Sequence, residues 1–212
     1  MHLAVFGGSG FIGSEICRQA IGKGWRVTSI SRSGQPLRQK SWHSEAVWIK
    51  ADIKDPETYK AYIRDCNVVC DSVGLLFSNY NQTMSDINAQ SCINLAKVCI
   101  ELKIKQFVHL SADRSTRIPF LMDEYFRTKQ QAEEFLLNEP HLEATILRPN
   151  LVYSPERPIS ITAELAIRYL RMILPLPEPL STQQVAKAVI RSIEMRRTGL
   201  MNIQDIVEIS KD

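Results

Sequence analysis

Residues 5–13 read Val-Phe-Gly-Gly-Ser-Gly-Phe-Ile-Gly, and this stretch decides the fold. It completes an apolar run, His2–Phe6, and leads into apolar residues at helical spacing. In a strand–turn–helix unit, Gly7 permits a sharp turn, Gly10 lets backbone approach a diphosphate, and Gly13 lets the helix pack close to the sheet. Such a helix start presents unpaired amides and the positive end of its dipole. The stretch therefore predicts a dinucleotide site, although a plain glycine-rich turn is the alternative.

Strand and helix patterns alternate along the first 150 residues. This alternation predicts a parallel sheet with right-handed helical crossovers, which is an α/β, doubly wound Rossmann fold. The predicted strands are His2–Phe6, Trp25–Ser31, Val47–Lys50, Asn67–Ser72, Gln106–Ser111 and Ala144–Leu147. The predicted helices are Phe11–Lys23, Pro56–Asp65 with Asp55 as its cap, Thr83–Leu102 and Asp123–Asn138.

The chain changes character after Pro149, where prolines become frequent. One helix is predicted over Thr162–Leu174, and a second over Thr182–Arg196 with Ser181 as its cap. The tail Leu200–Ile209 reads as extended. These elements predict a small, mostly helical C-terminal cap.

The length of 212 residues suits one full domain. We expect a dinucleotide-binding Rossmann domain over residues 1–150 and a short substrate or cap segment over residues 151–212, integral to the same domain. The net charge of +3 is too small to indicate a nucleic-acid partner. No stretch approaches the roughly 20 apolar residues that span a bilayer. No presequence is visible before the first predicted strand at His2.

The five cysteines have no paired short spacing and no neighbouring histidine pair. This pattern indicates reduced thiols and predicts no metal site. Of the histidines, His43, His109 and His141 show no acid–base partner in the sequence, and His109 is expected in the core.

Arg32, at the end of the second predicted strand, bears on which dinucleotide binds. A carboxylate at this place would hold the ribose 2′-hydroxyl of NAD, whereas an arginine between Ser31 and Ser33 can fork onto a 2′-phosphate. The sequence therefore favours NADP(H) over NAD(H), unless Arg32 points into solvent. Asp52-Ile53 is placed to meet the adenine, and Ser72-Val73-Gly74 to run beneath the dinucleotide.

Ser111, Tyr125 and Lys129 form a candidate catalytic set. Ser111 ends a predicted strand, and residues 125 and 129 share one helical face. A phenol can donate or accept the proton of a carbonyl reduction when a nearby cation makes the phenolate accessible. A unit charge about 4 Å away contributes on the order of 4 kcal/mol at an effective dielectric of 20. We therefore expect Lys129 to lower the pKa of Tyr125 and Ser111 to orient the carbonyl, although a Tyr–Lys pair at this spacing is also common by chance.

These motifs together resemble the extended and atypical short-chain dehydrogenases/reductases. The resemblance covers nearly the whole chain, and the segments that carry it are the glycine turn, Asp52-Ile53, Asn88, Phe107–Ser111, Tyr125 with Lys129, and Leu147-Arg148-Pro149. Residues 29–34, 111–113 and 181–185 are most similar to one branch. That branch contains a fungal mitochondrial dehydrogenase-like protein of ubiquinone biosynthesis and the 39-kDa-type accessory subunit of complex I.

The resemblance implies a role for each matching residue. It assigns Ser111, Tyr125 and Lys129 to catalysis and places Lys129 also on the nicotinamide ribose. The residues expected to hold the cofactor are Gly7, Ser9, Gly10, Phe11, Ile12, Gly13, Ser31, Arg32, Ser33, Asp52, Ile53, Ser72, Val73, Gly74, Lys129 and Pro149. Two features depart from the family: Asn150 stands where glycine is usual, and the segment after Pro149 is short.

Two functions follow as expectations. The first is an NADP(H)-dependent oxidoreductase, or an accessory factor, in mitochondrial ubiquinone biosynthesis, with a small-molecule or lipid-like substrate. The second is a non-catalytic subunit of a respiratory-chain assembly that holds a permanent nucleotide. A sugar-nucleotide epimerase is disfavoured by the short C-terminal segment.

The apolar segment Ile159–Leu174 either covers a core or rests on the inner membrane. The resemblance also implies a mitochondrial location, in the matrix or on the inner-membrane face.

Overall fold

A computed structural model describes residues 1–36, 39–76, 83–114, 122–156 and 178–211. The predicted helix Thr162–Leu174 and the predicted membrane-surface segment lie outside these residues. Within them, no helix is both long enough and apolar enough to cross a bilayer.

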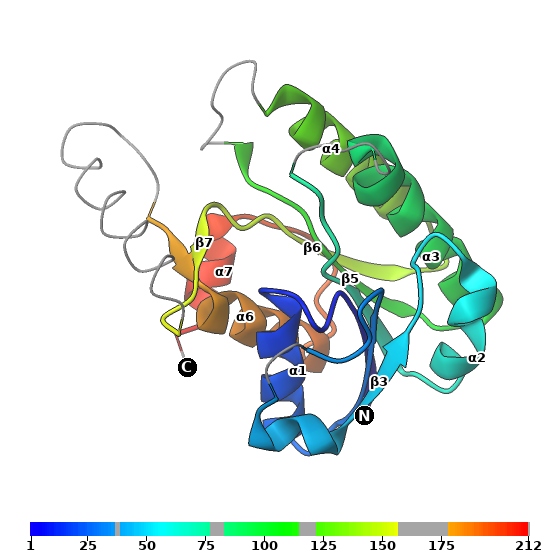
Figure 1. The fold of residues 1–212 in the computed structure, drawn as a ribbon. Coiled ribbons are helices and arrows are strands. Elements are labelled where there is room, and N and C mark those ends of the chain that lie inside the picture. Colours follow the sequence, from blue (N-terminus) through cyan, green and yellow to red (C-terminus); the bar gives the residue numbers. More distant parts are fainter. Residues whose placement is uncertain (37–38, 77–82, 115–121, 157–177, 212) are drawn as a thin grey trace.

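A seven-stranded sheet forms the centre of the molecule, and each of its strand pairs is parallel (Figure 1). Its spatial order is β3 (Ala46–Lys50), β2 (Arg26–Ser31), β1 (His2–Phe6), β4 (Val68–Asp71), β5 (Gln106–Leu110), β6 (Glu143–Leu147) and β9 (Gly199–Met201). A separate two-stranded parallel pair consists of β7 (Val152–Tyr153) and β8 (Leu180–Ser181).

Helices cover both faces of the sheet, as expected for a doubly wound fold (Figure 1). One face carries α1 (Gly13–Gly22), α6 (Thr182–Glu194) and α7 (Ile203–Ile209). The other carries α2 (Lys60–Ile63), α3 (Ser91–Glu101) and α4 (Asp123–Asn138). The remaining helical turns are η1 (Ser41–Glu45), η2 (Pro56–Thr58) and the π-helical η3 (Ser85–Gln90).

Alternate residues of the central strands enter two separate cores. In β1, Leu3 and Val5 pack toward α1 and α6, whereas Ala4 and Phe6 pack toward α3. All four are fully or almost fully buried. Because both faces are covered, the strand is apolar throughout, which is the pattern of a parallel sheet.

The C-terminal segment completes the sheet rather than only covering it. β9 pairs in parallel with β6, so the sheet has a seventh strand that the sequence analysis did not predict. The expectation that Leu200–Ile209 is extended is correct only for β9. The rest is wrong, because Asn202 and Asp205 form a capping box that starts α7. The division at residue 150 stays a prediction, while α6 and α7 contribute to one of the two cores.

Two predicted helices differ in detail from the structure. The helix expected over Pro56–Asp65 is split into η2 and α2 at Tyr59, whose ring is fully buried and packs edge-on against Phe6 at 4.8 Å between centroids. Asp55 does cap the first turn, because its side chain accepts a hydrogen bond from the Glu57 amide. The helix expected over Thr83–Leu102 begins with the π-helical turn η3, a form often found at functional sites.

An ion pair between a buried carboxylate and a partly exposed arginine anchors α4 to the sheet. Glu133 of α4, with its side chain 5% exposed, accepts two hydrogen bonds from the Arg148 guanidinium, which directly follows β6. Arg148 lowers the pKa of the Glu133 carboxyl by this bidentate contact, although burial alone would raise it. The pair fixes the helix that carries the predicted tyrosine and lysine.

We predict that Gly13→Ala destabilises the fold, whereas Gly22→Ala in the same helix does not. A Cβ at Gly13 would lie 2.3 Å from the Gly7 carbonyl oxygen, while a Cβ at the exposed Gly22 meets nothing within 4 Å. Urea unfolding should show a loss of about 1–3 kcal/mol for the first variant. It should show a gain of roughly 0.5–1 kcal/mol for the second. Equal stabilities for the two variants would contradict the close contact.

We predict that Arg148→Met destabilises the protein and that adding Glu133→Leu restores most of the loss. The single change leaves a buried carboxylate unpaired, which costs about 3 kcal/mol, whereas the double change leaves no charge to compensate. Lys23→Met is the control, because the Lys23–Glu194 pair is exposed at both ends and should contribute about 1 kcal/mol or less. Chemical denaturation of all variants measures these differences, and a double variant no more stable than Arg148→Met would refute this account.

Candidate dinucleotide-binding site

A cleft of about 880 Å³ opens at the carboxyl ends of the strands. It lies where the strand order reverses, because β1 is flanked by β2 on one side and β4 on the other. Open α/β sheets bind ligands at this topological switch point. The volume is near the upper end of the usual range of roughly 300–1,000 Å³, so the cleft suits a large ligand.

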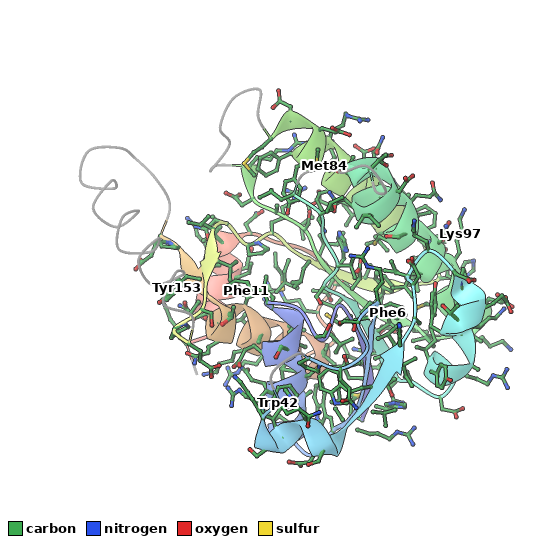
Figure 2. The ribbon with its side chains drawn as sticks, in the orientation of Figure 1. Phe6, Phe11, Trp42, Met84, Lys97 and Tyr153 are labelled. Carbon is green, nitrogen blue, oxygen red and sulfur yellow. The ribbon has the colours of Figure 1, made fainter. Side chains whose placement is uncertain are left out.

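Most of the predicted site residues line this cleft. They are Gly7, Ser9, Gly10, Phe11, Ile12, Ser31, Arg32, Ser33, Ile53, Ser72, Val73, Gly74, Ser111, Tyr125, Lys129 and Pro149. Figure 2 labels one lining side chain that was predicted, Phe11 from the turn before α1, and one that was not, Phe6 from the end of β1. Of the predicted residues, Gly13 and Asp52 are not among those that line the cleft.

The glycine turn has the shape that a diphosphate requires. Gly7 has a positive φ of 81°, and the Gly10 amide donates to the Gly7 carbonyl at 2.8 Å. Gly13 packs against the Gly7 carbonyl, so it lets α1 approach β1 closely but does not itself line the cleft. No side chain caps α1 at Ile12, so the helix start is open to an anion. These residues fit the phosphates of a dinucleotide.

Three serine hydroxyl groups cluster next to Arg32 in the structure. Ser9 Oγ lies 2.9 Å from Ser31 Oγ and 3.0 Å from Ser33 Oγ, and Ser31 Oγ donates to the Gly34 carbonyl at 2.8 Å. Together with Arg32 they form a polar rim of the cleft at the end of β2, in which the Ser9 and Ser31 hydroxyls donate to neighbouring oxygens. Such a rim suits phosphate oxygens.

Of the three residues that follow β3, two line the cleft and one forms a hydrogen bond within its own turn. Ala51 and Ile53 line the cleft, and both are buried. Asp52 instead accepts a hydrogen bond from the Lys54 amide at 3.0 Å. A direct contact between Asp52 and adenine therefore stays a prediction, and Ala51 is a lining residue that the sequence analysis missed.

Asn88 holds the segment that runs beneath the cleft. Its side chain accepts from the Leu75 amide at 2.7 Å and donates to the Leu75 carbonyl at 2.8 Å. It also donates to Thr128 Oγ1 at 3.3 Å, so η3 is joined to α4. Asn88 is fully buried and positions the chain just after Gly74.

The structure brings Ser111, Tyr125 and Lys129 to one wall of the cleft. The Ser111 hydroxyl is buried and has no hydrogen-bond partner among the described residues. The hydroxyl lies close enough to Glu133 to help lower the pKa of that carboxyl, but the two groups do not meet the distance and angle of a hydrogen bond. The catalytic roles of the three residues stay predictions.

Lys129 does not act on Tyr125 as expected. Its Nζ donates to the Val73 carbonyl at 3.1 Å and to the Leu110 carbonyl at 2.8 Å, beneath the cleft. Burial raises the pKa of Tyr125, and among the described residues no charged group counteracts it. The expected lowering of the Tyr125 pKa is therefore wrong for the structure as it stands, because the ammonium group is held by the strand ends.

His109 has an acid–base partner that the sequence analysis missed. Its Nδ1 lies 2.9 Å from Asp71 Oδ2, and both side chains are buried between β4 and β5. The expectation that His109 lies in the core is confirmed. The signal lay in the parallel register, which pairs positions 71 and 109 on adjacent strands.

Apolar residues line the part of the cleft beyond the predicted set. Leu76, Met122, Leu151 and Val152 contribute side chains there, and no sequence motif marked them. Asn150, which replaces the usual glycine, also lines the cleft and donates through its side chain to the Glu178 carbonyl at 2.5 Å. The residue thus ties the segment after β6 to the approach to β8.

Comparisons with known proteins agree with this geometry. Residues 7–195 match the model of the NAD(P)H-binding family. MIOREX complex component 2 of Saccharomyces cerevisiae is 29% identical, with 97% of this chain and 98% of the relative covered. The mitochondrial NADH dehydrogenase (ubiquinone) 1 alpha subcomplex subunit 9 of Arabidopsis thaliana is 30% identical, with 72% of this chain and 38% of the relative covered.

Solved structures show the same fold. UDP-glucuronic acid 4-epimerase from Bacillus cereus, in complex with NAD, superposes with a TM-score of 0.74. The sequences are 18% identical, and the match covers 96% of this chain and 77% of the epimerase, so the likeness concerns the fold alone. The family match, the switch-point cleft and the glycine turn lead to one conclusion: the chain belongs to the NAD(P)H-binding family and has a Rossmann fold.

Proposed function

We propose that the chain holds NADP(H) as a tightly bound, stabilising ligand and serves as an accessory component of a mitochondrial protein complex, in the matrix or on the inner-membrane face. The observation that carries the accessory role is the state of Lys129 and Tyr125. The ammonium group is engaged by two backbone carbonyls, and burial raises the pKa of the phenol. An ammonium group held in this way supports binding of a nucleotide rather than activation of the phenol.

Two similar proteins support membership of a complex. The relative from yeast is named as a component of the MIOREX complex, and the relative from Arabidopsis as a mitochondrial subunit of NADH dehydrogenase (ubiquinone). The first aligns over nearly the whole of both chains. A nucleotide that binds only the folded form stabilises that form by mass action. A component of an assembly could use a bound nucleotide in this way, without turning it over.

The preference for NADP(H) rests on the rim around Arg32. This arginine lies on the cleft wall beside the hydroxyls of Ser31 and Ser33. A guanidinium binds phosphate oxygens through charge-assisted hydrogen bonds, while a 2′-hydroxyl offers it no negative charge.

A second candidate is an oxidoreductase that acts on a carbonyl or alcohol of an apolar quinone precursor in ubiquinone biosynthesis. The shared cleft wall of Ser111, Tyr125 and Lys129 favours it, as do the apolar residues Leu76 and Leu151 nearby. NADP(H), when bound, supplies or accepts the hydride. Tyr125 would move the proton at its phenolic oxygen, and Ser111 would orient the carbonyl.

We predict that Arg32→Ala weakens NADPH binding and leaves NADH binding within about twofold. The lost charge-assisted contacts are worth about 1.5–3 kcal/mol, which corresponds to roughly 10–150-fold in affinity. Calorimetry with both nucleotides measures this. The control is Arg64→Ala, a change at an exposed arginine that does not line the cleft. The preference fails if wild-type protein binds NADH more tightly than NADPH, or if Arg32→Ala weakens both equally.

We predict that Tyr125→Phe leaves the bound nucleotide and its stabilisation unchanged. An accessory protein should co-purify with NADP(H), melt at a lower temperature once the nucleotide is removed, and consume no NADPH with quinone-type carbonyls. Mass spectrometry of the released small molecules, a melting curve and an absorbance assay at pH 7 test these points. Turnover by the wild type that collapses in Tyr125→Phe would replace the accessory role with the oxidoreductase.

A further inference from the structure

A group of buried polar side chains lies directly beneath the cleft. Asp71 ends β4, His109 lies in β5, Cys92 in α3 and Lys129 in α4, and each is at most 3% exposed. Of these, Lys129 is assigned to the nucleotide, and the other three have no part in the function proposed above. A buried ionisable group destabilises the folded state unless it is paired, so it matters which groups compensate one another here.

Hydrogen bonds orient the Asp71 carboxylate. It accepts from the Val73 amide at 3.0 Å through Oδ1 and meets His109 Nδ1 at 2.9 Å through Oδ2. The imidazole therefore carries its proton on Nδ1, and its Nε2 is a buried acceptor that has no partner among the described residues. A neutral imidazole satisfies one carboxylate oxygen but leaves the negative charge uncompensated.

Lys129 is a buried cation near this carboxylate, because its Nζ donates to the carbonyl of Val73, the same residue whose amide donates to Asp71. The two charges interact electrostatically. Its two hydrogen-bond partners, the Val73 and Leu110 carbonyls, are neutral, so they hold the ammonium group without balancing its charge. Glu133, one turn further along α4, already forms a bidentate pair with Arg148. Asp71 is thus the carboxylate left to compensate Lys129.

We propose that Asp71 is the counter-ion that keeps Lys129 protonated beneath the cleft, and that His109 is a positioning residue that holds the carboxylate in place. This inference rests on the proposed binding of NADP(H). A protonated lysine has three donors, two of which are used by carbonyls, so one remains for a ribose hydroxyl of the nucleotide. A neutral amine would lose both the charge and one donor.

The groups that face Lys129 act on it in opposite directions. Burial lowers the pKa of Lys129, while the carboxylates of Asp71 from β4 and, to a smaller extent, Glu133 from α4 itself raise it. His109, from β5, has a pKa lowered by burial and by Lys129, so it stays neutral. Burial also keeps the Cys92 thiol protonated by raising its pKa.

A metal ion at the same place is less consistent with these contacts. The heteroatoms of Asp71, Cys92 and His109 lie within 4.8 Å of one another. However, the Asp71 carboxylate is already bonded to His109 Nδ1 and to an amide, and the neighbouring ammonium group would repel a cation. Hydrogen bonds from His109 and the Val73 amide therefore hold the Asp71 carboxylate without a metal ion.

Asp71→Asn tests the proposal because it keeps the size of the side chain and removes its charge. NADPH affinity should fall as pH rises through the pKa of Lys129, since the neutral amine binds more weakly. In Asp71→Asn the midpoint of this fall should move by about one pH unit or more to lower pH. Calorimetry with NADPH from pH 6 to pH 10 measures it, and Cys92→Ser, an uncharged change in the same cluster, should keep the wild-type profile. An unchanged midpoint in Asp71→Asn overturns the counter-ion role.

A second readout does not depend on the nucleotide. Competitive labelling of amines, followed by mass spectrometry, gives the pH at which Lys129 becomes reactive, and Asp71→Asn should lower that pH by a similar amount. If wild-type protein binds no NADPH, the proposed function fails, while the labelling still tests the ion pair. An equal reactivity profile in wild type and variant would overturn the pair and leave the proposed function standing.

A double-mutant cycle covers the case in which Asp71→Asn does not fold. Removing both charges with Asp71→Asn and Lys129→Met leaves no buried cation to compensate, so the double variant should fold and be more stable than Asp71→Asn alone. Urea denaturation measures the coupling. A double variant that fails to fold, or that shows additive losses, would mean that Asp71 does not act through Lys129.

Discussion

The structure depends on the close approach of two backbones at Gly7 and Gly13. A Cβ at residue 13 would lie 2.3 Å from the Gly7 carbonyl oxygen and 2.6 Å from Ser72 Oγ. Because no side chain fits between β1 and α1, the helix begins close to the end of β1, and the turn that precedes it lines the cleft. Ser72 closes the same space from β4, since its hydroxyl donates to the Phe6 carbonyl at 2.6 Å. A single contact thus sets both the packing of α1 and the floor of the site.

Elements with strong local signals were predictable from the sequence, and elements defined by distant partners were not. The bounds of β1 and α4 agree with the prediction, because an apolar run ending in glycines and a long amphipathic stretch need no tertiary information. β9 is only three residues long and exists as a strand because β6 offers it an edge. α7 was read as extended because its Asn202 cap lies next to that short strand.

The candidate site divides in the same way. The glycine turn and the residues from Ser72 to Gly74 follow from motif and position, and the structure places most of them on the cleft. The partners of Lys129 are backbone carbonyls, which no residue pattern encodes, so the direction of the Tyr125 pKa could not be read from the sequence. The Asp71–His109 contact joins residues 38 positions apart and needs the strand register to be seen.

Tyr125, Lys129 and Glu133 lie four residues apart on one face of α4, and their partners explain why this helix is held so firmly. Glu133 is paired with Arg148 after β6, and Lys129 is bonded to the chain after β4 and at the end of β5. Two buried charges therefore fix the rotation and height of the helix from neighbouring strands. Tyr125, one turn before Lys129, is left at the cleft wall. The contacts of Glu133 and Lys129 thus position the phenol of Tyr125 at the cleft, and burial raises its pKa.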